Sequence, residues 1–296
     1  ALMEELTDID RSVIEVARGD GCLRTTLALE STSSAKRNEL NISKSDVFVV
    51  TGGARGITAE CVIRLSKHVN THFILLGRTD IDAPLPEWAQ NKGLKDLRRA
   101  ALEFLSQQGE QATPVKVNKM VDQVTRVVEV QETLKRIEEG GSRATYVNAD
   151  ITDTAKAVDA LVNVQEQFGQ ITGIIHGAGN LADKKIEKKT LEDFELVVDT
   201  KIQGLLNALS VVNPSALKHI CMFSSVSGFF GNAGQTDYSI ANEILSKLVH
   251  TCSRFLPNVQ AKSICWGPWD SGMVNETLKK AYADRNIAII SNGDIG

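Results

Sequence analysis

The sequence predicts an α/β fold in which helices cover both faces of a doubly wound parallel sheet. Short apolar runs rich in β-branched residues recur along the chain, as buried parallel strands require. Stretches of helical length separate these runs, so strand and helix alternate. The expected strands are 47–51, 72–77, 143–150, 171–179, 217–225 and 261–267. The expected helices follow the first strand to about residue 67 and span 153–168, 190–210 and 235–254.

The composition is that of an ordinary globular protein. The chain has 296 residues, and 33 Lys and Arg against 37 Asp and Glu give a net charge of −4. This balance argues against nucleic acid or an anionic membrane as a partner. The sequence has no run of about 18 apolar residues, so no membrane-spanning helix is expected. An acidic N-terminus unlike a signal peptide, and five cysteines without a CxxC pair, favour a cytoplasmic protein with reduced thiols and no metal site.

Two parts of the chain lie outside the alternation of strands and helices. Residues 1–46 have a weak pattern, with one possible strand at 21–30, and are interpreted as a linker or the tail of a preceding structural subdomain. Residues 47–296 are expected to form the main domain. Because no seventh strand is visible after residue 267, we expect a domain with a truncated C-terminus, as in a fragment of a longer polypeptide.

The segment between the second and third strands, about 79–142, is too long for a single crossover. It holds two helical candidates with the 3.6-residue period. One has an apolar face from Leu94 to Leu105, and the other starts at Pro114 with an apolar stripe from Val117 to Leu134. We interpret the segment as an inserted helical hairpin that packs on its own domain. The alternative is a surface to which a partner docks.

A glycine-rich turn lies between the first strand and the first helix. Glycines at such a turn allow the backbone to approach a pyrophosphate closely, and the helix N-terminus supplies N–H groups and a positive dipole end. A glycine cluster in this strand–turn–helix context is stronger evidence than one without it. The turn therefore predicts a dinucleotide site formed by Thr51, Gly52, Gly53, Arg55, Gly56 and Ile57.

The end of the second strand indicates which nicotinamide cofactor binds. A carboxylate there would bind a ribose 2′-OH and repel a 2′-phosphate. The strand instead ends at Gly77-Arg78, and two guanidiniums, Arg55 and Arg78, suit a phosphate dianion. NADPH is therefore predicted over NADH. Asp80 could take the NAD role if the strand is longer, and the alternative for both arginines is a solvated surface pair.

The Thr-Gly-x-x-x-Gly spacing resembles that of the short-chain dehydrogenase/reductase family, the Rossmann-type reductases, although Thr58 stands where the family usually has a third glycine. The resemblance implies that Asp150, followed by Ile151, accepts a hydrogen bond from the adenine amino group. The alternative is that Asp150 or Thr152 caps the next helix. It also implies that Gly177, Ala178 and Gly179 leave room for the adenosine ribose. His176 is interpreted as structural.

Four residues form the expected catalytic group. Ser225 ends the fifth strand and Tyr238 follows 13 residues later, the spacing found in this family. Most members have a lysine four residues after the tyrosine, where this chain has Asn242; Lys201 instead occupies the usual asparagine position on the preceding helix. This exchange resembles the ketoreductase domains of polyketide synthases and animal-type fatty acid synthases. The insertion and the segment from Trp266 to Val274 are similar to the ketoreductase of polyunsaturated fatty acid synthases.

The resemblance implies an NADPH-binding ketoreductase domain over 47–296, within a larger synthase whose other domains are its neighbours. Its substrate would be a 3-ketoacyl thioester on an acyl carrier protein. Tyr238 would donate the proton, with its pKa lowered by Lys201, and Ser225 would bond the carbonyl oxygen. Lys201 would also bond the nicotinamide ribose, and Asn242 would hold a relay of lysine, water and phenol. The alternatives are an inactive structural module and a free-standing alcohol dehydrogenase.

The substrate side of the site carries a further expectation. Leu181-Ala182-Asp183 keeps the second aspartate of a Leu-Asp-Asp motif that accompanies 3R alcohols, and Phe230 replaces the tryptophan that accompanies the opposite series. The 3R alcohol is therefore predicted. Met273 and Val274 are expected to border the substrate. The lysines at 184, 185, 188 and 189 either steer an acidic carrier protein or form a solvated face.

Overall fold

The computed structural model describes residues 41–270, 276–284 and 287–291. The chain divides between Asn41 and Ile42, and the elements below all belong to the part from Ile42 onward. The expected strand at 21–30 and the substrate contacts expected of Met273 and Val274 lie outside the described residues.

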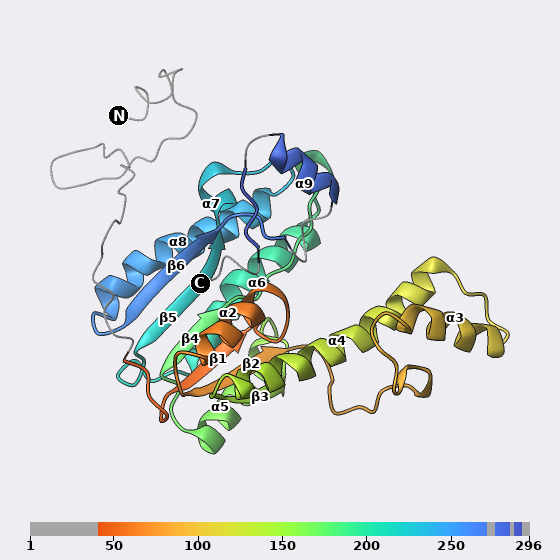
Figure 1. The fold of residues 1–296 in the computed structure, drawn as a ribbon. Coiled ribbons are helices and arrows are strands. Elements are labelled where there is room, and N and C mark those ends of the chain that lie inside the picture. The colour runs from red at the N-terminus through yellow and green to blue at the C-terminus, as the bar shows by residue number, and fades with distance from the viewer. Residues whose placement is uncertain (1–40, 271–275, 285–286, 292–296) are drawn as a thin grey trace. The chain divides into compact units, whose positions relative to one another are not determined.

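Six parallel strands form one sheet in the order β3-β2-β1-β4-β5-β6 (Figure 1). The order reverses between β1 and β4, which places a ligand crevice at the carboxyl ends of these strands. This topology confirms the predicted fold class. The strands are β1 Val47–Thr51, β2 His72–Gly77, β3 Arg143–Asn148, β4 Gly173–His176, β5 His219–Ser225 and β6 Gln260–Trp266.

Helices cover both faces of the sheet. Successive residues of a strand point to opposite faces, so each central strand contributes apolar side chains to both. Val47 and Val49 of β1 belong to one buried cluster, which also holds apolar residues of α5 (Thr154–Phe168), α6 (Leu191–Ser210) and α8 (Thr236–Phe255). Phe48 and Val50 belong to the other, with residues of α2 (Gly56–Ser66) and α4 (Pro114–Glu139). The central strands are thus buried on both sides, which explains their continuous apolar sequence.

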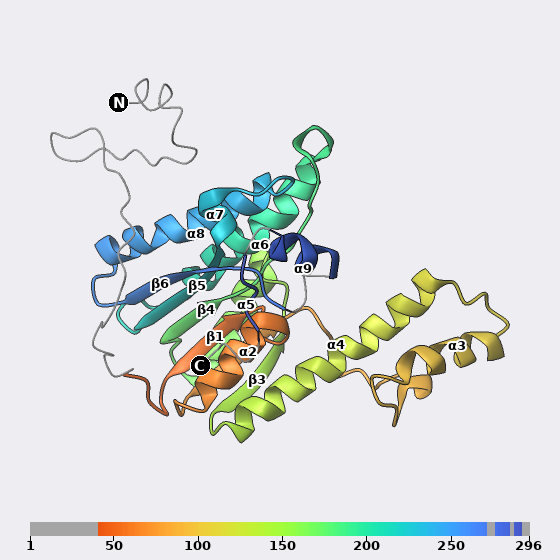
Figure 2. The same ribbon diagram turned by 45° about the horizontal axis from the view of Figure 1, so that its top comes forward.

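Helix α4 has two halves with different packing partners. In its second half, Val130 and Ile137 are fully buried in the sheet core, and Arg136 makes two hydrogen bonds of 2.6 and 3.0 Å to Glu60 of α2. In its first half, Val117 and Val124 pack instead with the 3₁₀ turn η1 (Glu87–Ala89) and α3 (Leu97–Gln107). The second half of α4 therefore serves as the crossover helix between β2 and β3. Only the preceding part extends beyond the sheet (Figure 2).

Short elements that the sequence pattern does not predict complete the described fold. They are a second 3₁₀ turn, η2 (Ile186–Lys188), and the helices α7 (Val226–Phe230) and α9 (Glu276–Ala283). Ser225 caps α7, and Gly231 ends it with a φ of +69°, a conformation that favours glycine. A five-residue helix is too short to show a helical period in sequence. Within the described ranges, no helix combines the length and apolar character that crossing a bilayer requires.

Candidate active site

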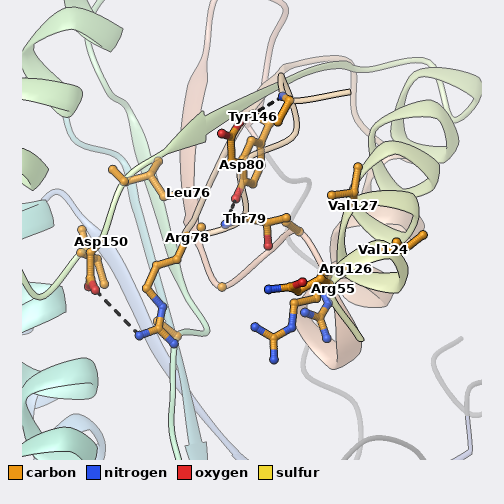
Figure 3. A pocket seen from close by; sticks show the side chains of 18 of the residues that line it. Arg55, Leu76, Arg78, Thr79, Asp80, Val124, Arg126, Val127, Tyr146 and Asp150 are labelled. Carbon is orange, nitrogen blue, oxygen red and sulfur yellow. Dashed lines mark hydrogen bonds and ion pairs between the residues drawn. The ribbon is translucent and has the colours of Figure 1, made fainter. Parts of the chain in front are cut away.

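A cavity of about 970 Å³ opens at the carboxyl ends of β1, β2, β3 and β4 (Figure 3). Its lining includes seven of the residues predicted to bind the cofactor: Gly52, Arg55, Arg78, Asp150, Ile151, Ala178 and Gly179. The five others lie in the same segments but do not line the cavity: Thr51, Gly53, Gly56, Ile57 and Gly177. The structure therefore brings together the segments that the sequence assigns to one dinucleotide site.

The glycine-rich turn lies against the end of β4. A Cβ atom on Gly52 would stand 2.8 Å from both the Cα and the amide nitrogen of Ala178, and the φ of Gly52 is +66°. Only glycine fits there without displacing the backbone. Arg55, the N-cap residue of α2, gives the helix no side-chain cap, and the first turn of α2 has no acidic residue. The first N–H groups and the positive end of α2 can therefore receive an anion.

Two arginines predicted to bind a phosphate line the cavity, and each has an acidic neighbour. Arg55 Nε donates a 2.6 Å hydrogen bond to Glu129 of α4, and Arg78 Nη1 lies 3.8 Å from a carboxylate oxygen of Asp150. Strand β2 ends at Gly77, so the longer strand needed for Asp80 to bind a ribose is not formed. Asp80 Oδ1 instead accepts the backbone N–H groups of residues 82 and 83 within a turn.

Arg126 is a cavity residue that the sequence pattern does not indicate. It comes from α4, and Figure 3 shows its side chain directed into the cavity together with that of Arg55. Within the described part of the chain, Arg126 makes no hydrogen bond or ion pair. The sequence shows that Arg126 lies beside the apolar stripe of α4. It does not show how α4 is oriented relative to the sheet, and this orientation is what brings Arg126 to the cavity.

The Asp150 side chain bonds within the turn before α5 and does not cap that helix. Its Oδ1 accepts hydrogen bonds from the backbone N–H of Thr152 at 3.0 Å and from the Thr152 hydroxyl at 2.7 Å. Burial acts to raise the pKa of Asp150, but these hydrogen bonds outweigh it and hold the pKa below its usual value. Asp153 caps α5 by accepting the N–H of Lys156. The alternative that Asp150 or Thr152 caps this helix is therefore wrong, because the helix starts one residue later.

His176 connects the glycine-rich turn to α6. The fully buried ring has Nδ1 at 2.8 Å from the Thr51 hydroxyl and Nε2 at 2.8 Å from the carbonyl oxygen of Lys201. Burial, and then the nearby charge of Lys201, lower the pKa of His176 to about 3, so the ring is neutral. With both nitrogens bonded inside the protein, His176 has the structural role that the sequence indicates.

Helix α2 and the segment after β4 fit together through Thr58 and Gly177. A Cβ atom on Gly177 would stand 2.1 Å from the Thr58 hydroxyl oxygen, and Thr58 is buried. Thr58 thus fills the space that a side chain at residue 177 would need. The non-glycine residue at the start of α2 is accommodated by a glycine after β4.

The four predicted catalytic residues lie close together, and Lys201 borders the cavity, because a Cβ atom on the lining residue Gly179 would be 3.3 Å from Lys201 Cε. None of the four is among the residues that line the cavity. The ammonium nitrogen of the buried Lys201 donates a 3.0 Å hydrogen bond to the carbonyl oxygen of Phe223 and lies 5.7 Å from the centroid of the Tyr238 ring. Asn242 donates from Nδ2 to the Tyr238 carbonyl oxygen at 2.7 Å. Among the described residues, the buried Oδ1 of Asn242 has no partner.

Ser225 has a hydroxyl that is oriented by its neighbour. Its oxygen accepts a hydrogen bond from the backbone N–H of Ser227 at 3.2 Å, and the Ser227 hydroxyl lies 2.9 Å away and donates to it. These two bonds occupy the acceptor positions of the Ser225 oxygen. Its own proton is therefore left to donate towards Tyr238 or a substrate carbonyl.

The pKa of Tyr238 lies above its ordinary value in the structure. Burial raises the pKa of this phenol, the side chains of Ser225 and Asn242 act in the opposite direction, and the charge of Asp183 adds to the increase. Lys201 is not among the groups that act on this pKa in the structure, where its ammonium donates to the Phe223 carbonyl. That Lys201, with a bound nicotinamide, lowers the pKa of Tyr238 stays a prediction. Burial also lowers the pKa of Lys201 itself, to about 8.

The residues expected to control stereochemistry lie on two segments. Asp183 accepts a 2.8 Å hydrogen bond from Gln235, which immediately precedes α8, and Leu181 is half-buried nearby in sequence. Phe230 ends α7, is 68% exposed and packs edge-on against Phe229. No group of three or more His, Cys, Asp or Glu side chains within the described ranges could hold a metal ion.

Comparisons with known proteins agree on one family. Residues 47–271 match the KR domain family. The chain is 37% identical over 302 residues to one component of the polyunsaturated fatty acid synthase of a Thraustochytrium species, covering 98% of this chain and 10% of that protein. It is 24% identical over 267 residues to polyketide synthase PksL of Bacillus subtilis, covering 88% of this chain and 5% of that protein. An N-terminal ketoreductase from the macrolactin assembly line has a TM-score of 0.62 at 25% identity, covering 87% of this chain and 42% of that structure.

Proposed function

Because the chain belongs to the KR domain family, the ketoreductases of the short-chain dehydrogenase/reductase superfamily, we propose that it reduces 3-ketoacyl thioesters carried on an acyl carrier protein, with NADPH. The observation that carries this proposal is the convergence of Lys201, Ser225, Tyr238 and Asn242, with Lys201 against Gly179 of the cavity lining.

The proposed partners follow from the size of the relatives. The chain spans only 10% of the fatty acid synthase protein and 5% of the polyketide synthase that it matches. We therefore propose that it works beside other domains of a synthase and receives its substrate from a carrier protein.

The residues of the cavity fit a nicotinamide dinucleotide. Gly52 permits a close approach of backbone, α2 presents uncapped N–H groups, and Asn242 keeps an unpartnered buried oxygen, among the described residues, close to the catalytic group. Gly52 and the start of α2 would hold the pyrophosphate, and Asp150 the adenine amino group. When bound, the cofactor supplies the hydride.

NADPH is favoured over NADH by the arginines around the cavity. Arg55 and Arg78 line it, and Arg126 adds a third guanidinium. Three carboxylates, those of Asp80, Asp150 and Glu129, oppose these three positive charges. Without Arg126 the net charge of these groups would be negative, which is unfavourable for binding a phosphate dianion.

The chain's own residues provide the proton and stabilise the developing charge. The Tyr238 phenol donates its proton to the carbonyl oxygen as that oxygen becomes an alkoxide. Ser225 donates a hydrogen bond to the same oxygen, oriented by the two bonds that it accepts from Ser227. The Lys201 ammonium lies across the ring and favours the phenolate that remains. Asn242 offers Oδ1, which has no partner among the described residues, to a relay that returns the proton.

The product is proposed to be the 3R alcohol. Asp183, which keeps the second aspartate of the motif, is held next to α8 by Gln235. Phe230, in place of the tryptophan of the opposite series, is the last residue of α7. Chiral chromatography of the product formed from a short 3-ketoacyl thioester tests both reaction and configuration. The expected result is NADPH oxidation matched by formation of the 3R alcohol; a protein that oxidises no NADPH with free or carrier-bound thioesters would refute the proposed function.

A further inference from the structure

A buried ion pair joins the loop before α6 to the first turn of α8. Lys189 Nζ donates a 2.7 Å hydrogen bond to Asp237 Oδ2, and the two side chains are only 6% and 1% exposed. Charged side chains are rarely buried so completely without a structural or functional reason. Lys189 therefore belongs neither to a solvated lysine face nor to a surface that steers a carrier protein.

The same two side chains also bond to the backbone of the 181–183 loop and to that of Tyr238. Lys189 Nζ also donates to the carbonyl oxygen of Ala182 at 2.8 Å. The other carboxylate oxygen of Asp237 accepts the backbone N–H of Tyr238 at 2.9 Å. A continuous chain of three hydrogen bonds thus runs from the loop at 181–183 to the backbone of the tyrosine.

Two further bonds connect the same segments and lie nearer the surface. The backbone N–H of Lys184 donates to the Gly234 carbonyl oxygen at 3.0 Å, and Gln235 donates to Asp183. The neighbouring lysines differ from Lys189. Lys184 pairs with Asp193 at the surface, whereas the exposed Lys185 and Lys188 have no side-chain partner within the described residues.

We propose that Lys189 and Asp237 form a positioning pair that fixes the 181–183 loop against Tyr238 and thereby selects the face of the ketone that is reduced. This inference rests on the proposed ketoreductase activity. Ala182 has no polar side chain with which to anchor the loop, so its carbonyl is the group that is held. Hydride and proton come from fixed positions, and the product configuration therefore depends on the side from which the thioester enters. When the 181–183 loop is held in one position, the thioester is favoured to enter from one side.

The test removes both charges together, because removing one would leave an unpaired buried charge and could unfold the protein. The variant is Lys189→Met/Asp237→Leu, and the matched control is Lys188→Met, which alters an exposed lysine one residue away. Two quantities are measured: hydrogen exchange of the Lys184 amide, which needs no substrate, and the ratio of 3R to 3S alcohol. Affinity for NADPH checks that the cofactor site is intact.

The double variant is expected to fold, to bind NADPH as wild type does and to exchange the Lys184 amide about tenfold faster or more, because local opening becomes easier. The share of the minor 3S alcohol should increase by about fivefold or more, because the released loop no longer favours one entrance. The control should change neither quantity. Unchanged exchange in the double variant overturns the anchoring. Faster exchange with an unchanged alcohol ratio overturns the stereochemical role. A wild type without reductase activity refutes the proposed function, while the exchange result still tests the anchoring.

Discussion

The Lys201 ammonium lies 5.7 Å from the centroid of the Tyr238 ring, while its hydrogen bond goes to the Phe223 carbonyl and not to the phenol. The two residues come from α6 and α8, which pack against each other beside the sheet. Burial disfavours the charged form of each, lowering the pKa of Lys201 to about 8 and raising that of Tyr238. Burial in the same region therefore favours the neutral form of both side chains.

Lys201 should lose its proton near pH 8 in the folded protein, well below the value of 10.5 for a free lysine. Between these two values the unfolded chain binds the proton and the folded one does not, so this residue makes folding more favourable as pH rises. Relative to Lys201→Met, wild type should gain stability on the order of 2–3 kcal/mol between pH 8 and 10.5. Urea unfolding at several pH values measures the difference. The exposed Lys188→Met serves as control, and a pH-independent difference for Lys201→Met would contradict the lowered pKa.

Thr58 and Gly177 should be energetically coupled. Gly177→Ala should destabilise the protein by about 1–3 kcal/mol, because the added methyl group overlaps the Thr58 side chain. Thr58→Gly, combined with Gly177→Ala, should recover part of this loss, which a double-mutant cycle detects. Thermal unfolding of wild type, the two single variants and the double variant supplies the free energies. Strict additivity would show that the two positions do not share space.

The arginines should determine the response to a 2′-phosphate. Wild type should bind 2′,5′-ADP more tightly than 5′-AMP, and Arg55→Ala/Arg78→Ala should remove most of this preference. Arg126→Ala should reduce it by a smaller factor without changing affinity for 5′-AMP. Titration calorimetry measures both affinities, and Arg98→Ala, on α3 outside the cavity lining, is the control. Equal affinities in wild type would remove the NADPH proposal; an unchanged Arg126→Ala would remove only the third arginine.

The strands, the glycine-rich turn and the meeting of the four candidate catalytic residues could be predicted, because each depends on residues near in sequence or at the spacing of the resembled family. The apolar run 47–51 and the glycines after it define β1 and its turn without any tertiary information. Ser225 and Tyr238 sit at the ends of elements whose order the fold class dictates. In parallel sheets, such ends meet at one edge.

The remaining features depend on how helices lie across the sheet. Arg126 enters the cavity only because α4 continues past the edge of the sheet, and the sequence pattern does not show where the helix turns from crossover to insertion. Lys189 stands in a run of exposed lysines, and only the position of Asp237 on another helix reveals its burial. The raised pKa of Tyr238 likewise follows from packing, which the spacing of motifs does not report.

The central claim, that this chain reduces ketoacyl thioesters with Tyr238 as proton donor, is tested most directly by the turnover of Tyr238→Phe. NADPH oxidation and hydroxyacyl formation are followed together with a short 3-ketoacyl thioester, and NADPH binding is titrated separately. The phenol is the proposed acid and is not among the residues lining the cofactor cavity, so turnover should fall by at least about 10²-fold while NADPH affinity stays close to that of wild type. Turnover at the wild-type rate in this variant would contradict the claim.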